Sequence, residues 1–319
     1  MRPLLALLLL IALPFTFCAQ AQEFPAKPLR IVVPWPPGGN VDITARTVQA
    51  ALGEALGQQV LVENRPGAGG TVGSGQVAKS APDGYTLLLG SSGTITNAPA
   101  VYKNISYDPV KDLTAIGPIQ STPMVLTAAP KTPVSNWQEF VLFTKTRTVS
   151  VASAGNGSSN HLALELLMRQ ANLPLLHVPY KGSGPAITDL IGSQVDAMVD
   201  QLSASIGHIR DARMKALAVT SRTRSAQLPN VPTLQELGVA NFEVYTFTGI
   251  FGPAGMPAQV VAKLHAALKK ALTVESVRER YRGMGVEVMD MSQPDFAAYV
   301  KADYEKWRLV AKERNIVVE

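Results

Sequence analysis

The sequence predicts an α/β fold of two lobes, because short β-branched runs alternate with longer helical patterns and this alternation occurs twice along the chain. In the first half the predicted elements are strand 29–33, helix 41–56, strand 59–63, helix 71–79 and strand 85–89. In the second half they are strand 150–153, helix 158–171, strand 175–178, helix 185–191, strand 197–200 and strand 216–220. Repeated βαβ units of this kind form parallel sheets with helices on both faces.

Two segments connect the halves. A strand-like run at 124–128 leads into the second half, and a β-rich run at 242–251 leads back. Three C-terminal helices are predicted after the return, at 258–272, 274–282 and 293–312. No low-complexity linker separates the halves, so we expect two close crossings with a cleft between the lobes. The expected division is lobe I at 22–123 and 245–319, and lobe II at 124–244.

The N-terminus has the pattern of a secretory signal peptide. An apolar run follows Arg2 and leads to Ala19-Gln20-Ala21, a small-x-small triplet typical of a signal-peptidase site. Cleavage after this triplet removes residues 1–21 together with the single cysteine, Cys18, so the mature chain has no disulfide. Phe17 is too bulky for the residue that precedes a lipoprotein cysteine. No second apolar stretch reaches the roughly 20 residues of a membrane-spanning helix, so we expect the mature protein to be soluble in an export compartment.

The mature chain carries a small positive charge that is spread along its length. It has 29 Lys and Arg residues against 24 Asp and Glu, and the loss of Arg2 with the signal peptide leaves 28 − 24 = +4. The sequence has no basic run with interleaved aromatic residues, which argues against a nucleic-acid partner. The charge is compatible with an anionic ligand but does not by itself indicate one.

The segment PWPPGGNVD, residues 34–42, connects the first predicted strand to the first predicted helix. The N–H groups at the start of a helix lack intrahelical partners, and the helix dipole favours a negative group there. Gly38 and Gly39 let a ligand approach the backbone, while the prolines stiffen the turn. We expect this loop to present amides to an anion, with Asp42 holding the loop as a cap. An ordinary strand-to-helix turn is the alternative.

The second half contains a comparable loop at residues 153–161. Ser153, Ser158 and Ser159 add hydroxyl groups, and Asn156 tolerates left-handed backbone geometry. Both loops follow the carboxyl end of a strand, where ligands bind in open α/β sheets. The two loops are therefore predicted to hold one carboxylate from opposite sides of the cleft. His161 either meets this ligand or packs at the start of the helix.

Further candidates lie at other strand ends. Residues 90–94 follow a strand of the first half, and Lys181 and Asp200 follow two strands of the second. Lys181 either neutralises a ligand charge or faces solvent, and Asp200 either accepts a hydrogen bond from the ligand or caps a buried turn. The run at 65–70 is like a phosphate loop, but it lacks the Gly-Lys-Ser/Thr ending and the third dinucleotide-binding glycine. No nucleotide or other cofactor is therefore predicted.

The sequence contains none of the catalytic motifs considered. Its four histidines stand far apart without a His-Glu-x-x-His pattern, so no metal site is expected. Neither a Gly-x-Ser-x-Gly elbow nor a Ser-x-x-Lys motif occurs. The alternatives to a binding protein are an exported enzyme acting on a small organic acid and a structural or adhesive module.

Several segments, in order along the chain, carry a family resemblance. They read KPLRIVVPWPPGGNVDITAR, VLVENRPGAGGTVGSGQVAKSAPDGYTLLLG, YDPVKDLTAI, HVPYKGSGPAITDLIGSQVDAM, ALAVTSRTRSAQLPNVPTLQELG and GPAGMPAQVVAKL. Together they span nearly the full mature length. The sequence resembles the Bug family of extracytoplasmic solute receptors, the TctC-type binding proteins of tripartite tricarboxylate transporters.

The resemblance implies a two-lobed periplasmic-binding-protein fold, type II-like, with the ligand in the interlobe cleft and flytrap closure. It implies a small organic acid or related molecule, held by backbone amides of loops 35–42 and 153–161 and by two bridging waters, with loop 91–94 shaping the distal pocket. The implied partners are membrane subunits of a tripartite tricarboxylate transporter or a sensor kinase, and a monomer suffices. Ser158 and Val199 replace the usual threonine and phenylalanine, so the specific acid is left open. The candidate ligand-binding residues are Trp35, Pro37, Gly38, Gly39, Asp42, Ser91, Ser92, Thr94, Ser153, Gly155, Asn156, Gly157, Ser158, His161, Lys181 and Asp200.

Overall fold

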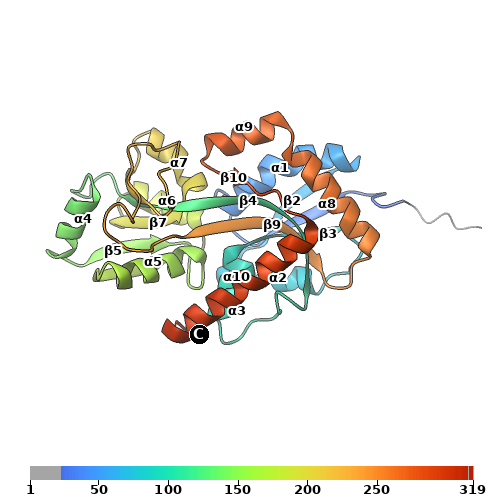
Figure 1. Ribbon diagram of the computed structural model, residues 1–319, viewed down its shortest axis with the longest axis horizontal. Helices are drawn as coiled ribbons and strands as arrows, with labels where there is room; N and C mark the ends of the chain where they lie inside the picture. Colours follow the sequence, from blue (N-terminus) through green and yellow to red (C-terminus); the bar gives the residue numbers. More distant parts are fainter. Residues whose placement is uncertain (1–22, 315, 319) are drawn as a thin grey trace, which may run out of the picture.

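A computed structural model describes residues 23–314 and 316–318 of the chain. The predicted signal peptide, including Cys18, lies outside these residues. Figure 1 shows an elongated molecule in which a long sheet joins a lobe built from the N-terminal and C-terminal segments to a lobe built from the middle of the chain. Helices cover the sheet on both faces, as the βαβ alternation predicts.

Parallel strands form the two ends of the sheet, and long antiparallel strands join them. The order is β2-β1-β3-β9-β4-β7-β5-β6, with β8 and β10 also paired to β4. The parallel strands are β1 (Leu29–Val33), β2 (Val60–Asn64) and β3 (Thr86–Ser91) at one end and β5 (Val149–Ser153), β6 (Leu175–Pro179) and β7 (Ala197–Gln201) at the other. The remaining strands are β4 (Leu113–Ala128), β8 (Lys215–Val219), β9 (Tyr245–Pro253) and β10 (Glu287–Val288).

The strand β4 changes partners along its length. From Leu113 to Pro123 it pairs with β9, and from Met124 onward it pairs with β7. On the return, the Val244 N–H donates to the Thr220 carbonyl oxygen just before β9 begins. We propose that these changes of partner mark the lobe boundaries, after residue 123 and after residue 244.

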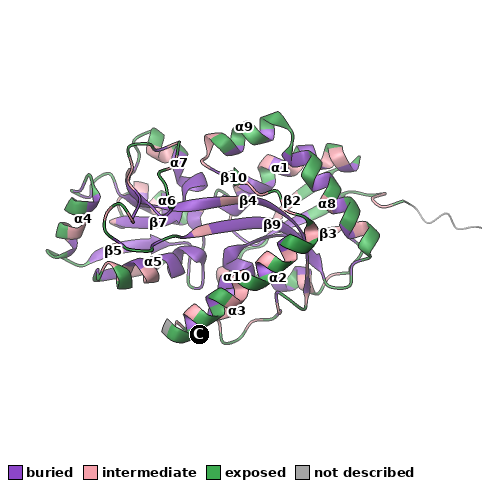
Figure 2. Ribbon diagram, in the orientation of Figure 1, coloured by how far each residue is buried: buried purple, intermediate pink, exposed green. Residues whose placement is uncertain are grey.

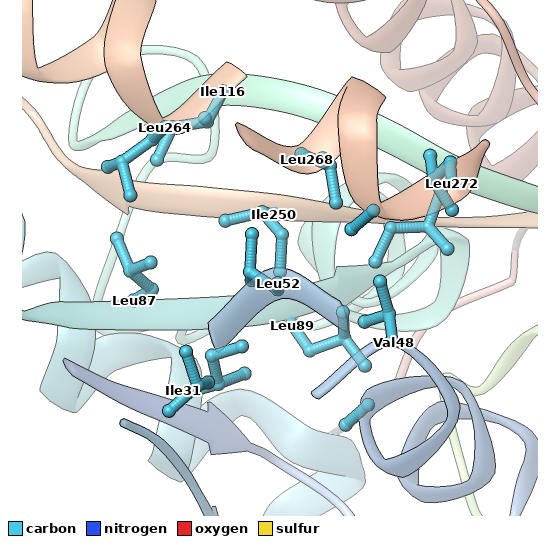
Figure 3. Packing of buried hydrophobic residues seen from close by; sticks show 14 of the residues in the cluster. Ile31, Val48, Leu52, Leu87, Leu89, Ile116, Ile250, Leu264, Leu268 and Leu272 are labelled. Carbon is cyan, nitrogen blue, oxygen red and sulfur yellow. The ribbon is translucent and has the colours of Figure 1, made fainter. Parts of the chain in front are cut away.

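The core of lobe I lies on both faces of its sheet, because alternate side chains of a strand point to opposite faces. In β1, Ile31 packs with helices α1 (Asn40–Leu56), α8 (Ala258–Leu272) and α9 (Glu275–Gly283). Its neighbour Val32 packs on the other face with α2 (Thr71–Ala78) and α10 (Gln293–Arg314). Figure 3 shows Ile31, Leu52 and Leu268 as members of the first cluster, and Figure 2 shows that the central strands are almost wholly buried.

Lobe II repeats this arrangement. Val151 of β5 belongs to a cluster with α4 (Trp137–Thr144) and α5 (Ser159–Gln170). The next residue, Ala152, belongs to a cluster on the other face with α6 (Ser183–Ile191) and α7 (Leu202–Arg210). Both lobes therefore place helices on each face of a parallel sheet.

The structure also contains elements that the sequence patterns did not indicate. They are the 3-10 turn η1 (Ala68–Gly70), the π-helix η2 (Gly93–Asn97), α3 (Ala98–Val101), α4, α7 and β10. In addition, β4 is much longer than the expected strand 124–128, because it continues through Gly117 and Pro118, where its register with β9 shifts. Within the described residues, no helix has both the length and the apolar character needed to cross a membrane.

Candidate ligand-binding cleft

A small cavity, here called the inner cavity, lies between the two lobes. It offers ≈ 30 Å³ to the centres of water molecules, where a single water needs roughly 10–15 Å³. Lobe I contributes Trp35, Pro36, Gly39, Asn40, Val41, Ser91 and Gly93 to its walls, and lobe II contributes Ala154, Ser158, Ser159, Asn160, Ser183 and Gln201. None of these lining side chains is charged.

Four α-helices begin at the inner cavity, and so does the π-helix η2, whose first residue is Gly93. The first residues of α1, α5 and α6 are Asn40, Ser159 and Ser183, and α7 follows Gln201 directly. No side chain caps the N-termini of α1, α6 or α7, so capping does not occupy their first N–H groups. Each helix N-terminus carries a partial positive charge, so the inner cavity favours an anionic group although no cation lines it.

Asp42 holds the first-lobe loop from behind. Its Oδ2 accepts a hydrogen bond from the Gly38 N–H at 3.0 Å, which fixes the glycine in a left-handed conformation with φ of 87°. The Arg46 Nε and Asn64 Nδ2 groups also donate to this carboxylate. Burial alone raises the pKa of Asp42, but the hydrogen bonds from Arg46, Asn64 and Gly38 outweigh burial and lower the pKa. The carboxylate therefore holds the loop, as predicted, but it accepts from Gly38 before the helix and caps none of the N–H groups of α1.

Ser158 caps the second-lobe helix. Its Oγ accepts a hydrogen bond from the His161 N–H at 3.2 Å and donates to the Gly155 carbonyl oxygen at 2.6 Å. The His161 Nδ1 accepts a hydrogen bond from the Gly157 N–H at 3.2 Å. His161 thus stabilises the start of the helix. It lines neither the inner cavity nor a larger hollow between the lobes, which is lined by Trp35 and Lys181 among others.

A second histidine supports the same loop. The rings of His177, on β6, and His161 stack with centroids 4.3 Å apart, and the His177 Nε2 lies 2.6 Å from the Ser153 Oγ. The Ser153 Oγ also accepts the Gly155 N–H at 3.1 Å. Burial and then the neighbouring His161 lower the pKa of His177 to about 4, and burial lowers the pKa of His161 despite the nearby Glu165. Two neutral imidazoles therefore support the loop at neutral pH.

Asp200 is fully buried and orients two residues of the inner cavity. Its Oδ1 accepts hydrogen bonds from the Asn160 Nδ2 and the Ser183 Oγ, both at 2.7 Å. Burial raises the pKa of Asp200 to about 6, although these hydrogen bonds act in the opposite direction. Of the two roles predicted for Asp200, the geometry agrees with the buried one.

Hydrogen bonds cross the cleft and hold the lobes in a closed arrangement. The Ser203 Oγ donates to the Asn40 Oδ1 at 2.6 Å. At the edge of the cleft, the Tyr102 hydroxyl donates to the Asn156 carbonyl oxygen at 2.9 Å. No group of His, Cys, Asp and Glu suited to a metal ion occurs within residues 23–314 and 316–318.

The predicted loops reach the cleft, but their residues fall into three groups. Those that line the inner cavity are Trp35, Gly39, Ser91 and Ser158. Those that line a larger adjoining hollow are Trp35, Gly155, Asn156 and Lys181. Those that line neither are Pro37, Gly38, Asp42, Ser92, Thr94, Ser153, Gly157, His161 and Asp200. Ser92 and Thr94 belong to the loop that was expected to shape the distal pocket, but their hydroxyls bond to the protein backbone. The Ser92 hydroxyl accepts a hydrogen bond from the Phe247 N–H, and the Thr94 hydroxyl accepts one from the Ser91 N–H.

Five polar residues of the inner cavity were not in the list of candidate ligand-binding residues, although Ser159 was noted as a hydroxyl of its loop. They are Asn40, Ser159, Asn160, Ser183 and Gln201. Each stands in the first turn of a helix or immediately before it. The sequence contained this signal, because every one of them lies in or beside a loop that follows a predicted strand.

Comparison with known proteins identifies the family. Residues 44–316 match the Tripartite tricarboxylate transporter family receptor, TctC. This chain belongs to the TctC family. A curated relative, Protein BugT of Bordetella pertussis, is 34% identical over 296 residues, which are 92% of this chain and 91% of BugT.

Solved structures resemble this TctC-family receptor over nearly its whole length. The periplasmic binding protein BugD is 37% identical with a TM-score of 0.89, over 93% of this chain and 100% of BugD. MatC from Rhodopseudomonas palustris, with bound malate, is 35% identical with a TM-score of 0.86, over 90% of this chain and 99% of MatC. R. palustris Rpa4515, with adipate, is 31% identical with a TM-score of 0.89, over 92% of this chain and 99% of that one. These likenesses confirm the predicted Bug-family resemblance and the two-lobed binding-protein fold, so the chain is a solute-binding protein.

Proposed function

We propose that this receptor captures a small carboxylate in the periplasm by closing its two lobes around it, for tripartite tricarboxylate transport or for sensing. The observation that carries the proposal is the convergence of helix N-termini, from both lobes, on a cavity without charged side chains. Backbone N–H groups and neutral hydroxyls at helix N-termini stabilise an anion without requiring a fixed cation.

Closure follows from the distribution of these groups between the lobes. An acid docked on one lobe meets only part of the donor set, and the other lobe adds its donors on closing. The ligand therefore has a higher affinity for the closed state than for the open one, which is the condition for ligand-driven closure. The closed state presents a distinct surface to membrane subunits of a transporter or to a sensor kinase. One cleft per chain makes a monomer sufficient for this role.

The composition of the inner cavity favours binding over catalysis. General acid–base catalysis needs a titratable group within hydrogen-bond reach of the substrate. No titratable side chain is among the residues that line the inner cavity, and Asp200 lies behind its wall, bonded to Asn160 and Ser183. The malate-bound and adipate-bound relatives support a carboxylate ligand for this chain.

The proposal is tested by thermal shift on the mature protein, refolded from denaturant so that no captured ligand remains. Matched pairs of an acid and its uncharged amide, such as succinate and succinamide, separate recognition of the carboxylate from recognition of the carbon skeleton. A ligand that binds only the native state, at 100 times its dissociation constant, stabilises it by about 2.7 kcal/mol. We expect acids to raise the melting temperature and their amides to leave it unchanged. Equal shifts by both members of a pair, or conversion of a bound acid seen by NMR, would contradict the proposal.

A further inference from the structure

The C-terminal helix α10 takes part in packing on both sides of the boundary between the lobes. Its first half lies in the core of lobe I, where Phe296 packs with Val32 of β1. Trp307 and Ala311, further along the helix, belong to a separate cluster that also contains Leu162 of α5, a lobe II helix. Figure 1 shows α10, in red, extending from the lobe I sheet toward α5. One helix of lobe I therefore makes apolar contacts that join it to lobe II.

Leu162 lies behind the ligand site rather than in it. It follows Ser159 and Asn160, which line the inner cavity at the start of α5. Leu162 itself lines neither the inner cavity nor the larger hollow, and it is 1% exposed in this closed arrangement. Separation of the lobes would expose Leu162 and its lobe I partners to water, which is unfavourable for apolar side chains. The cluster therefore stabilises the closed state without touching the ligand.

Two buried hydrogen bonds connect α10 to the same helix of lobe II. The Asp303 carboxylate, on α10, accepts from the Thr96 Oγ1 at 2.7 Å, and Thr96 belongs to the π-helix η2. The next residue of η2, Asn97, accepts through its Oδ1 from the Ser159 Oγ at 3.3 Å. Thr96 and Asn97 are both fully buried. Through η2, α10 is thus also connected to a side chain that lines the inner cavity.

Residue 318, near the end of the chain, strengthens the cluster. Val318 belongs to it and forms a parallel bridge with Tyr102. The Val318 N–H donates to the Val101 carbonyl oxygen at 2.9 Å. On its other side, the Tyr102 hydroxyl donates to the Asn156 carbonyl oxygen of lobe II. The segment that meets lobe II at the edge of the cleft is therefore held in place by the C-terminal residues that pack with α10.

We infer that the second half of α10 is a latch that holds α5 against lobe I in the closed state and thereby sets ligand affinity from outside the cleft. The latch consists of Trp307, Ala311 and Val318, and its contact on lobe II is Leu162. Trp307 and Leu162 are positioning residues, because neither lines the ligand site. The inference rests on the proposed function in one respect, since it requires the lobes to close on a ligand.

The test compares two leucines of α5 that are equally buried, at 1% exposure each. Leu162→Ala removes the lobe II side of the latch contact, whereas Leu167→Ala removes a side chain of the lobe II core. Calorimetric titration measures the affinity of the ligand-stripped mature protein, and stopped-flow mixing measures the association and dissociation rates. The probe is the acid that raises the wild-type melting temperature most, with succinate, malate and adipate tried first.

We expect Leu162→Ala to bind the acid about tenfold more weakly than the wild type, because the lost contact is made only when the lobes are closed. The loss should appear as faster dissociation with a nearly unchanged association rate, since closure follows docking. Leu167→Ala should lower the melting temperature as well, because it leaves a cavity in the lobe II core. Its affinity should stay within about twofold of the wild type, since its contacts are the same in the open and closed states.

A double-mutant cycle assigns the effect to the latch. Trp307→Ala should itself weaken binding, and in its background Leu162→Ala should cost less than about threefold, because the two side chains belong to one cluster. Val101→Ala, in the same cluster, takes the place of Trp307→Ala if that variant does not fold.

The inference is overturned if Leu162→Ala binds like the wild type, if Leu167→Ala loses as much affinity, or if Leu162→Ala costs the same in both backgrounds. In each of these cases the wild type still binds the acid, so the proposed function stands. If no acid binds the stripped wild-type protein, the proposed function fails and the inference fails with it.

Discussion

Substitution of Gly157 by alanine should block closure of the lobes without unfolding either of them. Gly157 has φ of 71°, and a Cβ at this position would lie 2.3 Å from the Tyr102 Cε2 of the opposite lobe. Two carbon atoms in ordinary contact are about 3.5–4.0 Å apart, so either the Tyr102 ring must move away from residue 157 or the lobes must separate locally, by at least about 1 Å. This separation also breaks the hydrogen bond from Tyr102 to the Asn156 carbonyl, which contributes about 0.5–1.5 kcal/mol net. We expect ligand affinity to fall by about tenfold or more, which corresponds to about 1.4 kcal/mol.

Gly57 provides a matched control for backbone strain. It has φ of 66° at the end of α1, and an added Cβ there meets no atom within 4 Å. Alanine at either glycine costs roughly 1–2 kcal/mol, because a side chain disfavours left-handed geometry. Gly57→Ala and Gly157→Ala should therefore lower the melting temperature of the ligand-free protein by similar amounts. Only Gly157→Ala should weaken ligand binding in calorimetric titration.

A double-mutant cycle with Tyr102→Ala isolates the interlobe clash. Removal of the Tyr102 ring eliminates the atom that the new Cβ would meet. Gly157→Ala should then have no further effect on affinity in the Tyr102→Ala background, which gives a coupling energy of about 1 kcal/mol or more. The reasoning is refuted if Gly157→Ala binds ligand as tightly as Gly57→Ala, or if its loss of affinity is the same with and without the tyrosine ring.

Three further predictions concern the groups that support the loops. Asp42→Ala leaves the Gly38 N–H without its acceptor and should lower the free energy of unfolding by about 1–3 kcal/mol in urea denaturation. Arg46→Ala removes a half-exposed partner of the same carboxylate and should lower it by less than about 1 kcal/mol. The folded-state pKa of His177 is lowered to about 4, so its contribution to stability is complete above its unfolded pKa of about 6.5 and is lost as the pH falls toward 4. The free energy of unfolding in urea, measured from pH 7 to 4, should fall in the same window and should fall less in His177→Gln. The pKa of Asp200 is raised to about 6, so its contribution is complete below about pH 3.8 and is lost as the pH rises through 6. The stability of Asp200→Asn relative to the wild type, measured by thermal unfolding, should therefore improve between pH 4 and pH 7, and a constant difference would contradict the raised pKa.

The sequence was most informative where local pattern and tertiary packing agree. The helix at 258–272 has the bounds that its apolar periodicity predicts, since one face of α8 packs on the lobe I sheet. Helix α4 was missed although Asn136 caps it by accepting the Glu139 N–H, a spacing that the sequence displays. Helix α7 begins directly after β7 without a turn residue to separate them, so the pattern showed only the strand. The first part of β4 was hidden because Pro118 and Gly117 interrupt the run, and the structure accommodates them with shifts of register.

The location of the site could be predicted from the sequence, but the side chains that face it could not. The carboxyl ends of parallel strands meet at one edge of a sheet, which places the loops without further information. Within the first turn of a helix, successive side chains point about 100° apart, so the choice between Asn160 and His161 depends on how the helix packs. At the end of β7, successive side chains point to opposite sides of the strand. The Asp200 side chain is fully buried, whereas the Gln201 side chain lines the inner cavity. These orientations depend on contacts between segments far apart in the sequence.

The helix N-termini at the inner cavity are divided unequally between the lobes, and this division predicts an order of events. Lobe II presents α5, α6 and α7, whereas lobe I presents α1 and the π-helix η2, which begins at Gly93. If each N-terminus acts as roughly half a positive charge, lobe II carries about three fifths of the field that favours the anion. We therefore expect the acid to dock on lobe II first and lobe I to close over it. On this order, Asp200→Asn, which disturbs Ser183 on lobe II, should slow association in stopped-flow measurements. Gly157→Ala, which obstructs closure, should speed dissociation and leave the association rate nearly unchanged.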